Sequence, residues 1–208
     1  VYACTQDPAL YASLEAAVAD LLTTQDALGR ITTYSPEASF QGWDLWGRKY
    51  VLLGLQYFLE ICRDEALGEA IVAAMCRHAD DVLLHIGPAE EGKLEINEAT
   101  SHWHGLNSSS ILEPMVRLYS LTGEARYLEF ARYIVGRGGT SVGNLFEMAY
   151  EDALDPYQYP VTKAYEMMSC FEGLLEYARA TGIEKWRLAV ERFAKRVLSS
   201  DITLIGCA

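Results

Sequence analysis

The hydrophobic positions of the chain form helical patterns of two alternating kinds. Between Trp46 and Ile61 they cover nearly the whole circumference of a helix, as expected of a helix buried on all sides. Between Leu67 and Val82 they form one stripe at helical spacing, with the charged residues elsewhere. We call the first kind inner helices and the second kind outer helices. The pattern predicts inner helices over 46–61, 110–121 and 163–179, and outer helices over 67–82, 125–136 and 184–198.

The turns between inner and outer helices recur at a fixed step. Arg63 and Gly123 are 60 residues apart, and Gly123 and Gly182 are 59 apart, each in the same turn setting. A weaker copy of the turn lies one step earlier, at 6–10. This repeat predicts an all-α fold of the α/α-toroid, six-hairpin glycosidase type, with about three and a half helical hairpins present.

Two stretches depart from the helical pattern. Residues 136–160 hold four glycines and two prolines, which predicts a long loop over one end of the stack. Residues 201–205 alternate between polar and apolar side chains and predict a short terminal strand.

Composition narrows the kind of protein and the kind of partner. Half of the residues are hydrophobic, enough for a sizeable core, yet no uninterrupted apolar stretch reaches the roughly 18 residues of a membrane-spanning helix. The net charge of −12 disfavours nucleic acid and favours a neutral ligand. The five cysteines are odd in number and contain no C-x-x-C pair, so we expect reduced thiols, no metal or cofactor in this chain, and a cytoplasmic rather than an exported protein.

The loops that lead into the inner helices carry the candidate chemistry. Asp44, His104 and Lys163 are 60 and 59 residues apart, which is the step of the repeat, so they are expected at the same end of the stack. Aromatic rings and hydrogen-bonding groups together suit sugars, whose C–H faces stack on indole while their hydroxyls need donors and acceptors. The candidate substrate-binding residues are Trp43, Asp44, Trp46, His102, Trp103, His104, Asn107 and Lys163.

Some of these residues also have a structural interpretation. Asp44 is a favoured helix cap, and Ser110 with Glu113 fits a capping box that places Pro114 in the first helical turn. His102 and His104 could belong to a metal site, but no other ligand cluster accompanies them.

One carboxylate is a candidate for acid/base chemistry, while no catalytic residue is assigned. Lys163, Glu166 and Cys170 share one face of a helix, so Lys163 could tune the pKa of Glu166 as a general acid or base. The alternative is an ion pair within the helix. Four side chains are interpreted as packed core residues. They are His78, Met167, Met168 and Cys170 itself.

Three blocks of sequence resemble a known family. They are residues 43–55 (WDLWGRKYVLLGL), 111–123 (ILEPMVRLYSLTG) and 163–174 (KAYEMMSCFEGL). They are similar to the β-L-arabinofuranosidase-like glycosidases, glycoside hydrolase family 127 and its uncharacterised relatives, from about Leu22 to the end of the chain.

The resemblance implies a fold and a chemistry. It implies an (α/α)6 catalytic toroid followed by β-sandwich domains, and hydrolysis of arabinofuranosides with retention of configuration. It also implies a zinc-bound cysteine thiolate as nucleophile and a glutamate as acid/base in the full-length parent, from motifs expected after Cys207. Residues 1–208 are therefore expected to form a single domain, a partial toroid that ends before closure.

The hypothesis for function is the N-terminal part of a glycoside hydrolase catalytic domain that binds a neutral carbohydrate at an apical pocket and is inactive as an isolated fragment. The alternatives are a non-catalytic helical-repeat interaction module and another toroid chemistry, a lyase or a sugar epimerase. At about 60 residues a hairpin, a closed toroid needs roughly 360 residues. We therefore expect the open faces to drive self-association.

Overall fold

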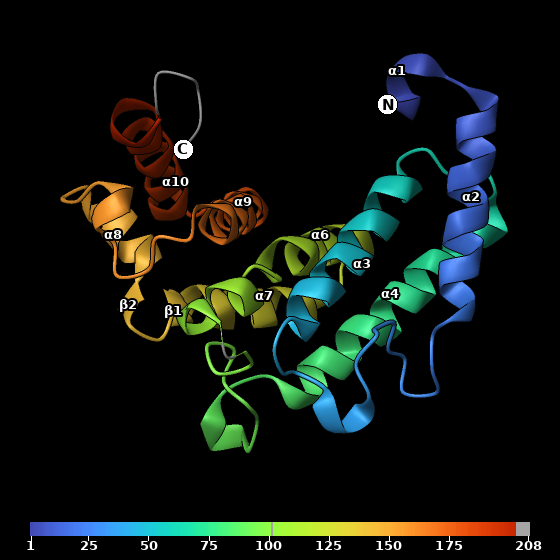
Figure 1. Ribbon diagram of the computed structural model, residues 1–208, viewed down its shortest axis with the longest axis horizontal. Helices are drawn as coiled ribbons and strands as arrows, with labels where there is room; N and C mark the ends of the chain where they lie inside the picture. Colours follow the sequence, from blue (N-terminus) through green and yellow to red (C-terminus); the bar gives the residue numbers. More distant parts are fainter. Residues whose placement is uncertain (101, 203–208) are drawn as a thin grey trace.

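The protein is a stack of antiparallel helical hairpins, seen in a computed structural model that describes residues 1–100 and 102–202. Figure 1 shows the hairpins following one another in chain order along an arc, with α2 near one end and α10 near the other. The helices are α1 (Tyr2–Thr5), α2 (Pro8–Thr23), α3 (Asp44–Leu59), α4 (Glu65–His85), α5 (Leu106–Ser109), α6 (Leu112–Thr122), α7 (Ala125–Arg137), α8 (Leu145–Glu151), α9 (Ala164–Thr181) and α10 (Glu184–Arg196).

The predicted repeat is confirmed. Three hairpins, α3–α4, α6–α7 and α9–α10, follow a half hairpin made by α2, so the all-α toroid fold with about three and a half hairpins is correct. The turns lie where the sequence places them: Gly123 and Gly182 end α6 and α9 with φ of 73° and 68°, a left-handed conformation that glycine adopts without strain. Asp64 begins α4 by accepting a hydrogen bond from the Leu67 amide at 2.9 Å.

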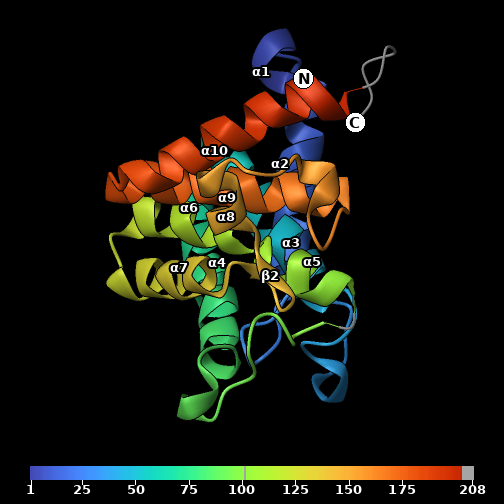
Figure 2. The same cartoon turned by 90° about the vertical axis from the view of Figure 1, so that its left-hand side faces the viewer.

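The inner helices α3, α6 and α9 line the inner side of the arc, and the outer helices cover them (Figures 1 and 2). The α6–α9 crossing is close because residue 173 is glycine: a Cβ there would lie 2.7 Å from the Glu113 amide nitrogen. On the far side of α9, the rings of Phe171 and Phe193 stack with centroids 3.7 Å apart and join α9 to α10. The core thus runs between the two layers from one hairpin to the next.

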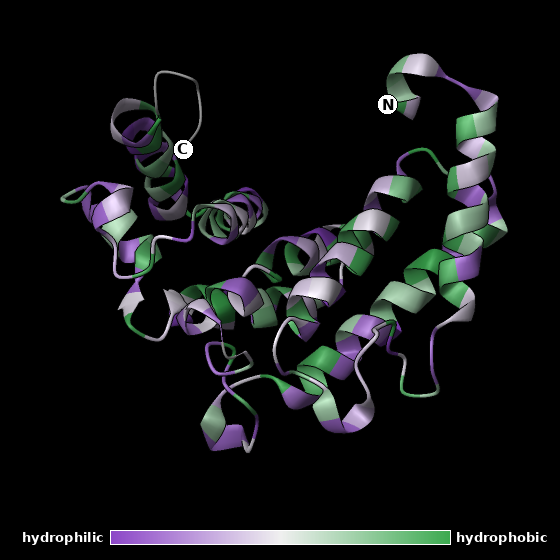
Figure 3. Ribbon diagram, viewed as in Figure 1, coloured by the Kyte–Doolittle hydropathy of each residue, from purple (hydrophilic) through white to green (hydrophobic). Residues whose placement is uncertain are grey.

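Figure 3 shows that hydrophobic and hydrophilic positions share the same helices. The prediction that the first inner helix, α3, is buried on all sides is wrong, because part of its surface is exposed. On α3, Tyr50 and Tyr57 are 40% and 50% exposed, and they share one exposed face of the helix with Gly47 and Gly54. The sequence pattern overlooked this because tyrosine counts as hydrophobic in it. A tyrosine, however, can present its ring edge and hydroxyl to water.

Three further details correct the predicted elements. The expected loop over 136–160 holds a small hairpin of β1 (Gly139–Thr140) and β2 (Gly143–Asn144), then α8, whose buried face packs on α10. The capping box at Ser110 and Glu113 is wrong, because α6 begins at Leu112 after Ile111 and the Ser110 hydroxyl donates to the Asn107 carbonyl at 2.6 Å. Pro114 does lie in the first turn of α6.

The remaining segments are short. They are η1 (Pro36–Ala38), η2 (Ala89–Glu91), η3 (Trp103–Gly105), η4 (Pro156–Gln158) and the π-helical η5 (Val197–Asp201). The predicted strand over 201–205 begins inside η5 at Asp201, and its residues 203–205 lie outside the described part of the chain, as does Cys207. None of the helices among the described residues is long and apolar enough to cross a membrane.

Candidate functional site

Three loops from different hairpins meet at the apical end, which we define as the end where α3 and α9 begin. Trp43 immediately precedes α3, and its ring stacks on His102 with centroids 4.7 Å apart. Lys163 immediately precedes α9, and its Nζ lies 5.6 Å from the centroid of the Trp103 ring. The loops that hold Asp44, His104 and Lys163, the three residues related by the repeat step, therefore lie at one end, and of these three Lys163 takes part in the contacts.

The aromatic contacts continue from these loops onto α3 and α9. Trp46 packs edge-on against Trp43 and against Tyr165, with centroids 6.0 and 5.5 Å apart. The Tyr165 hydroxyl lies 2.7 Å from the Tyr50 hydroxyl. We call Trp43, Trp46, His102, Trp103, Lys163 and Tyr165 the apical cluster. Tyr165 is absent from the sequence-based list; its only signal was its position two residues after Lys163.

The backbone of the middle loop is firmly held. Trp103 and His104 both have a φ of 52°, which is uncommon for residues with side chains. Gly105 follows with a φ of 92°, and a Cβ there would lie 2.4 Å from the Asn97 Cα, so only glycine fits. The Thr100 hydroxyl donates to the Gly42 carbonyl at 2.7 Å and ties this loop to the one before α3. The two loops thus form one unit.

His104 and Asn107 occupy opposite environments in this unit. The His104 side chain is exposed, and its carbonyl accepts a hydrogen bond from the Ser141 amide at 2.9 Å. Asn107 is buried; its Nδ2 donates to the Gly42 carbonyl at 3.4 Å, while its Oδ1 has no hydrogen-bond partner among the described residues. Asn107 therefore offers a spare acceptor beneath the rim.

Asp44, like His104 and Asn107, is a predicted residue outside the apical cluster, and its side chain turns away from it. It is buried at the first position of α3, and Trp43 rather than Asp44 is the cap residue. Its carboxylate accepts hydrogen bonds from the Thr32 hydroxyl at 2.6 Å and the Phe40 amide at 2.8 Å. Arg48 Nε, at 3.1 Å, supplies a third donor. These contacts anchor the start of α3.

Arg48 extends this anchor to α4, which the sequence did not indicate. Its Nη1 lies 2.5 Å from Asp81 Oδ2, so the guanidinium bridges two buried carboxylates, Asp44 and Asp81. His78 lies beside it as the predicted core histidine, and its Nδ1 accepts the Ile31 amide at 3.0 Å. Burial first, and then the Arg48 charge, lower the pKa of His78 to about 3, so the ring is neutral at pH 7.

Glu166 is the buried carboxylate beside the apical cluster. Its Oε2 lies 4.0 Å from Lys163 Nζ, so the predicted ion pair is present but long, and that oxygen has no hydrogen-bond partner within the described part of the chain. Cys170, one turn further on, donates its thiol to the Leu106 carbonyl at 3.2 Å. Burial raises the pKa of Cys170 to about 12, so its side chain stays a protonated thiol. Cys170 and Met167 pack in the hydrophobic core and Met168 packs against it, as predicted.

Lys49 is a second buried cation near the apical cluster. Its Nζ lies 5.2 and 5.3 Å from the ring centroids of Trp46 and Tyr50, and no carboxylate of the described residues comes within 4.0 Å of it. Burial lowers the pKa of Lys49, and the charge of Glu113 on α6 opposes that shift. Burial in turn raises the pKa of Glu113. Neither pKa shift could be predicted from the sequence, because both arise from contacts between hairpins.

The residues 1–100 and 102–202 contain no group of three or more histidine, cysteine, aspartate and glutamate side chains placed to hold a metal ion. The described part of the chain therefore does not fit the zinc that the resemblance implies for the parent protein. The apical cluster offers stacking surface and one cation, Lys163, and the nearby Asn107 and Glu166 add unpartnered acceptors.

A stack of helical hairpins with aromatic and polar loops gathered at one end defines an α/α-toroid of the glycosidase type. The chain belongs to the family described as β-L-arabinofuranosidase, GH127 catalytic domain, whose model matches residues 1–208. This confirms the family suggested by the three sequence blocks.

A solved structure agrees with the fold. The chain is similar to the crystal structure of a GH127 β-L-arabinofuranosidase from Geobacillus stearothermophilus T6, with a TM-score of 0.63 and 16% sequence identity over 93% of this chain. The match spans 33% of the length of that enzyme chain. No curated protein matches the chain.

Proposed function

We propose that this chain is part of the catalytic domain of a β-L-arabinofuranosidase-like glycoside hydrolase and binds a neutral glycan at the apical cluster. Family membership and the toroid fold support this class of protein. The observation that supports the binding site is that Trp43 and Trp46 pack together while Lys163 contacts Trp103 and Glu166. Asn107, bonded to the Gly42 carbonyl beside Trp43, and Glu166 each add an unpartnered acceptor.

The parts of the apical cluster suit different parts of a sugar ring. The exposed faces of Trp43 and Trp103 provide platforms for C–H groups. Lys163 provides an ammonium donor, and His102 and His104 provide imidazole nitrogens at the rim. Small rotations of Asn107 and Glu166 would let their unpartnered oxygens accept from sugar hydroxyls. Asp44 contributes indirectly, by fixing the start of α3.

We assign binding rather than bond cleavage to the residues described. Glycoside hydrolysis usually needs two carboxyl groups across the scissile bond, and Glu166 is the carboxyl group that forms an ion pair with a member of the apical cluster, Lys163. It is the candidate acid/base residue. Cys170 remains protonated and buried and cannot serve as a nucleophile. We therefore expect the 208-residue chain to bind a glycan without turning it over.

Tryptophan fluorescence provides a direct test, since Trp43, Trp46 and Trp103 lie in the apical cluster and the fourth tryptophan, Trp186, lies on α10. Titration with arabinofuranosides should change the emission saturably and should release heat in calorimetry. Trp43→Ala should weaken binding by about tenfold, equal to about 1.4 kcal/mol, while Trp186→Ala should leave it unchanged. Neither heat nor an emission change with any of a panel of arabinosides and other furanosides would refute the proposal.

A further inference from the structure

The peptide unit between Gly42 and Trp43 is held at both of its polar atoms. The Gly42 carbonyl accepts hydrogen bonds from the Thr100 hydroxyl at 2.7 Å and from Asn107 Nδ2 at 3.4 Å. The Trp43 N–H donates to the Tyr34 hydroxyl at 3.1 Å. Gly42 has a φ of 53°, and glycine allows a wide range of backbone conformations, so these bonds select one orientation of the peptide. The backbone that carries the Trp43 indole is therefore fixed before any ligand arrives.

Thr100 also holds the other half of the Trp43–His102 stack. Its Oγ1 accepts the His102 amide at 3.1 Å, while its proton is donated to the Gly42 carbonyl. A hydroxyl has one proton to donate and lone pairs to accept, so one side chain makes both bonds. The two stacked rings have their centroids 4.7 Å apart and an interplanar angle of 25°. One hydroxyl thus links the backbones of two stacked side chains from different loops.

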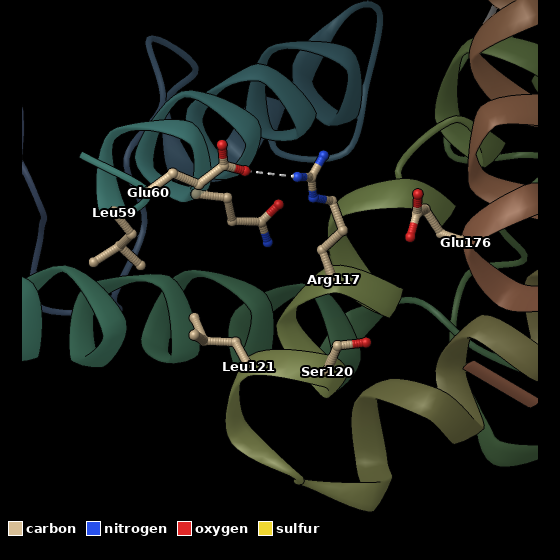
Figure 4. Close-up of a pocket in the computed structure, with 7 residues that line it drawn as sticks. Leu59, Glu60, Arg117, Ser120, Leu121 and Glu176 are labelled. Atoms are coloured by element: carbon tan, nitrogen blue, oxygen red, sulfur yellow. Dashed lines mark hydrogen bonds and ion pairs between the residues drawn. The ribbon is translucent and has the colours of Figure 1, made fainter. Parts of the chain in front are cut away.

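The opposite end of the same two hairpins is joined in another way. There Arg117 on α6 has its Nη2 3.1 Å from Oε1 of Glu60, the residue that follows α3 (Figure 4). A partly exposed ion pair between two long side chains contributes little and leaves both backbones free to adjust. A bond from a short hydroxyl to a backbone carbonyl constrains the backbone directly. Thr100 therefore makes the tighter of the two links, at the end that carries the apical cluster.

The surface that Thr100 fixes is one that a ligand can use. Trp43 is 38% exposed and His102 is half-buried, so their stack lies outside the hydrophobic core. Side chains that are ordered before binding lower the entropy cost of binding. Binding sites are held in this way by supporting hydrogen bonds behind the residues that touch the ligand.

We propose that Thr100 is a positioning residue of the apical site, which sets the Trp43 indole on the His102 ring as a rigid platform for a sugar ring. Thr100 acts through the Gly42 carbonyl and the His102 amide and does not touch the ligand. Tyr34 supports it from the other side of the same peptide unit. The inference rests on the proposed function for its ligand, while the geometry of the stack can be tested without one.

The geometry is tested in the ligand-free chain labelled with 5-fluorotryptophan. The ¹⁹F signal of Trp43, assigned from its loss in Trp43→Phe, senses the ring current of His102. Thr100→Val keeps the size of the side chain and removes both hydrogen bonds, so it should move this signal toward its position in His102→Ala. In a His102→Ala background Thr100→Val should have no further effect. Thr100→Ser, which keeps the hydroxyl, should give the wild-type signal.

Thr122 is the matched control, because its hydroxyl makes the same pair of bonds elsewhere. It donates to the Leu118 carbonyl at 2.8 Å and accepts the Glu124 amide at 3.2 Å, at the end of α6. Thr122 and Thr100 are both half-buried. Thr122→Val should leave the Trp43 signal and the affinity for sugar unchanged.

Titration with methyl β-L-arabinofuranoside tests the link to binding. Thr100→Val should weaken the affinity by about threefold to tenfold, as for the net loss of one hydrogen bond. In a Trp43→Ala background the same substitution should cause no further loss, because Thr100 acts through Trp43.

Any of four results would overturn the proposal. They are an unmoved Trp43 signal in Thr100→Val, an equal shift in Thr122→Val, wild-type affinity in Thr100→Val, and a loss of affinity that persists in the Trp43→Ala background. If no sugar binds to the wild type, the proposed function fails, and the ¹⁹F signals still decide whether Thr100 positions the stack. Should Thr100→Val not fold, Tyr34→Phe frees the other end of the same peptide unit and should move the Trp43 signal. An unmoved signal in that variant overturns the proposal as well.

Discussion

The two sides of α3 carry adjacent buried cations in opposite circumstances. Arg48, 0% exposed, faces the outer layer, where Asp44 and Asp81 hold its guanidinium at 3.1 and 2.5 Å. Lys49, 1% exposed, lies near the inner helices between two aromatic rings, with no carboxylate of the described residues within 4.0 Å. One helix thus combines a charge paired with two carboxylates and a charge with no carboxylate partner.

The difference indicates that the Arg48 side of α3 stabilises the fold and that the Lys49 side is the candidate for function. A buried charge that is paired and hydrogen-bonded is a fixed structural element, and removing its partner is costly. A buried charge without a partner is unfavourable for folding and lowers the pKa of its own group, as burial does for Lys49. Perturbed groups of this second kind concentrate at functional sites. Four measurements test this comparison.

The largest expected effect is on the outer side of α3. Arg48→Met leaves Asp44 and Asp81 buried together without their shared cation, so the free energy of unfolding should fall by about 3–5 kcal/mol in urea denaturation followed by circular dichroism. Arg132→Met, at an exposed position on α7, should change it by less than about 0.5 kcal/mol. Equal losses in the two variants would contradict the structural role of Arg48.

The second effect is the pH dependence of the free energy of unfolding that His78, on the same side of α3, should cause. Its pKa is near 6.5 in the unfolded chain and about 3 in the folded one, so the unfolded state binds the extra proton as pH falls from 6.5. His78 should therefore lower the stability by about 1.4 kcal/mol for each pH unit below 6.5.

The control for this pH dependence is His78→Asn, whose Oδ1 can still accept the Ile31 amide but does not titrate. Its stability should fall less steeply than that of the wild type between pH 6.5 and 5, in urea denaturation at each pH. Parallel curves for the two proteins would show that His78 does not stay neutral in the fold.

A smaller effect of opposite sign is expected on the inner side. Lys49→Met removes a buried, unpaired ammonium and keeps most of its volume, so unfolding at pH 7 should be unchanged or up to about 1 kcal/mol more costly. Because the folded-state pKa of Lys49 is lowered, the unfolded state binds its proton more tightly, and the wild type gains stability as pH rises. The advantage of Lys49→Met should therefore shrink at alkaline pH. A loss as large as that of Arg48→Met would erase the contrast between the two cations.

The smallest effect concerns the hydroxyl pair that links α3 to α9. Tyr50→Phe removes the 2.7 Å contact with the Tyr165 hydroxyl and should lower the unfolding free energy by about 0.5–1 kcal/mol, since both rings are exposed. Tyr157→Phe, exposed in η4, is the matched control and should have no measurable effect in thermal denaturation. If the control loses as much stability, the hydroxyl pair contributes nothing specific.

The helices and the meeting of the apical loops followed from the sequence, because both depend on local spacing. Helical periodicity and the turn glycines Gly123 and Gly182 are properties of neighbouring residues, and a repeat carries one position of a hairpin onto the next. This is how Trp43, Trp103 and Lys163 were placed together without a structure.

What the sequence could not show depends on pairs that the repeat does not relate. Arg48 and Asp81 are 33 residues apart, on an inner and an outer helix, and nothing in either segment marks the other as its partner. Asp44 was predicted for the apical pocket because its spacing matched, but its side chain turns toward Thr32 and Arg48. Spacing fixes where a residue lies along the stack, and packing decides which way it points.

Gly105 has a consequence for how this rim can diversify. Since the backbone there can tolerate no Cβ against Asn97, the path of the loop is invariant while the side chains at His102, Trp103 and His104 project from it into solvent or onto one neighbour. A population of variants selected for new ligands should therefore accumulate substitutions at 102–104 and none at 105. Gly105 thus fixes the backbone of the rim, while the side chains at 102–104 can change.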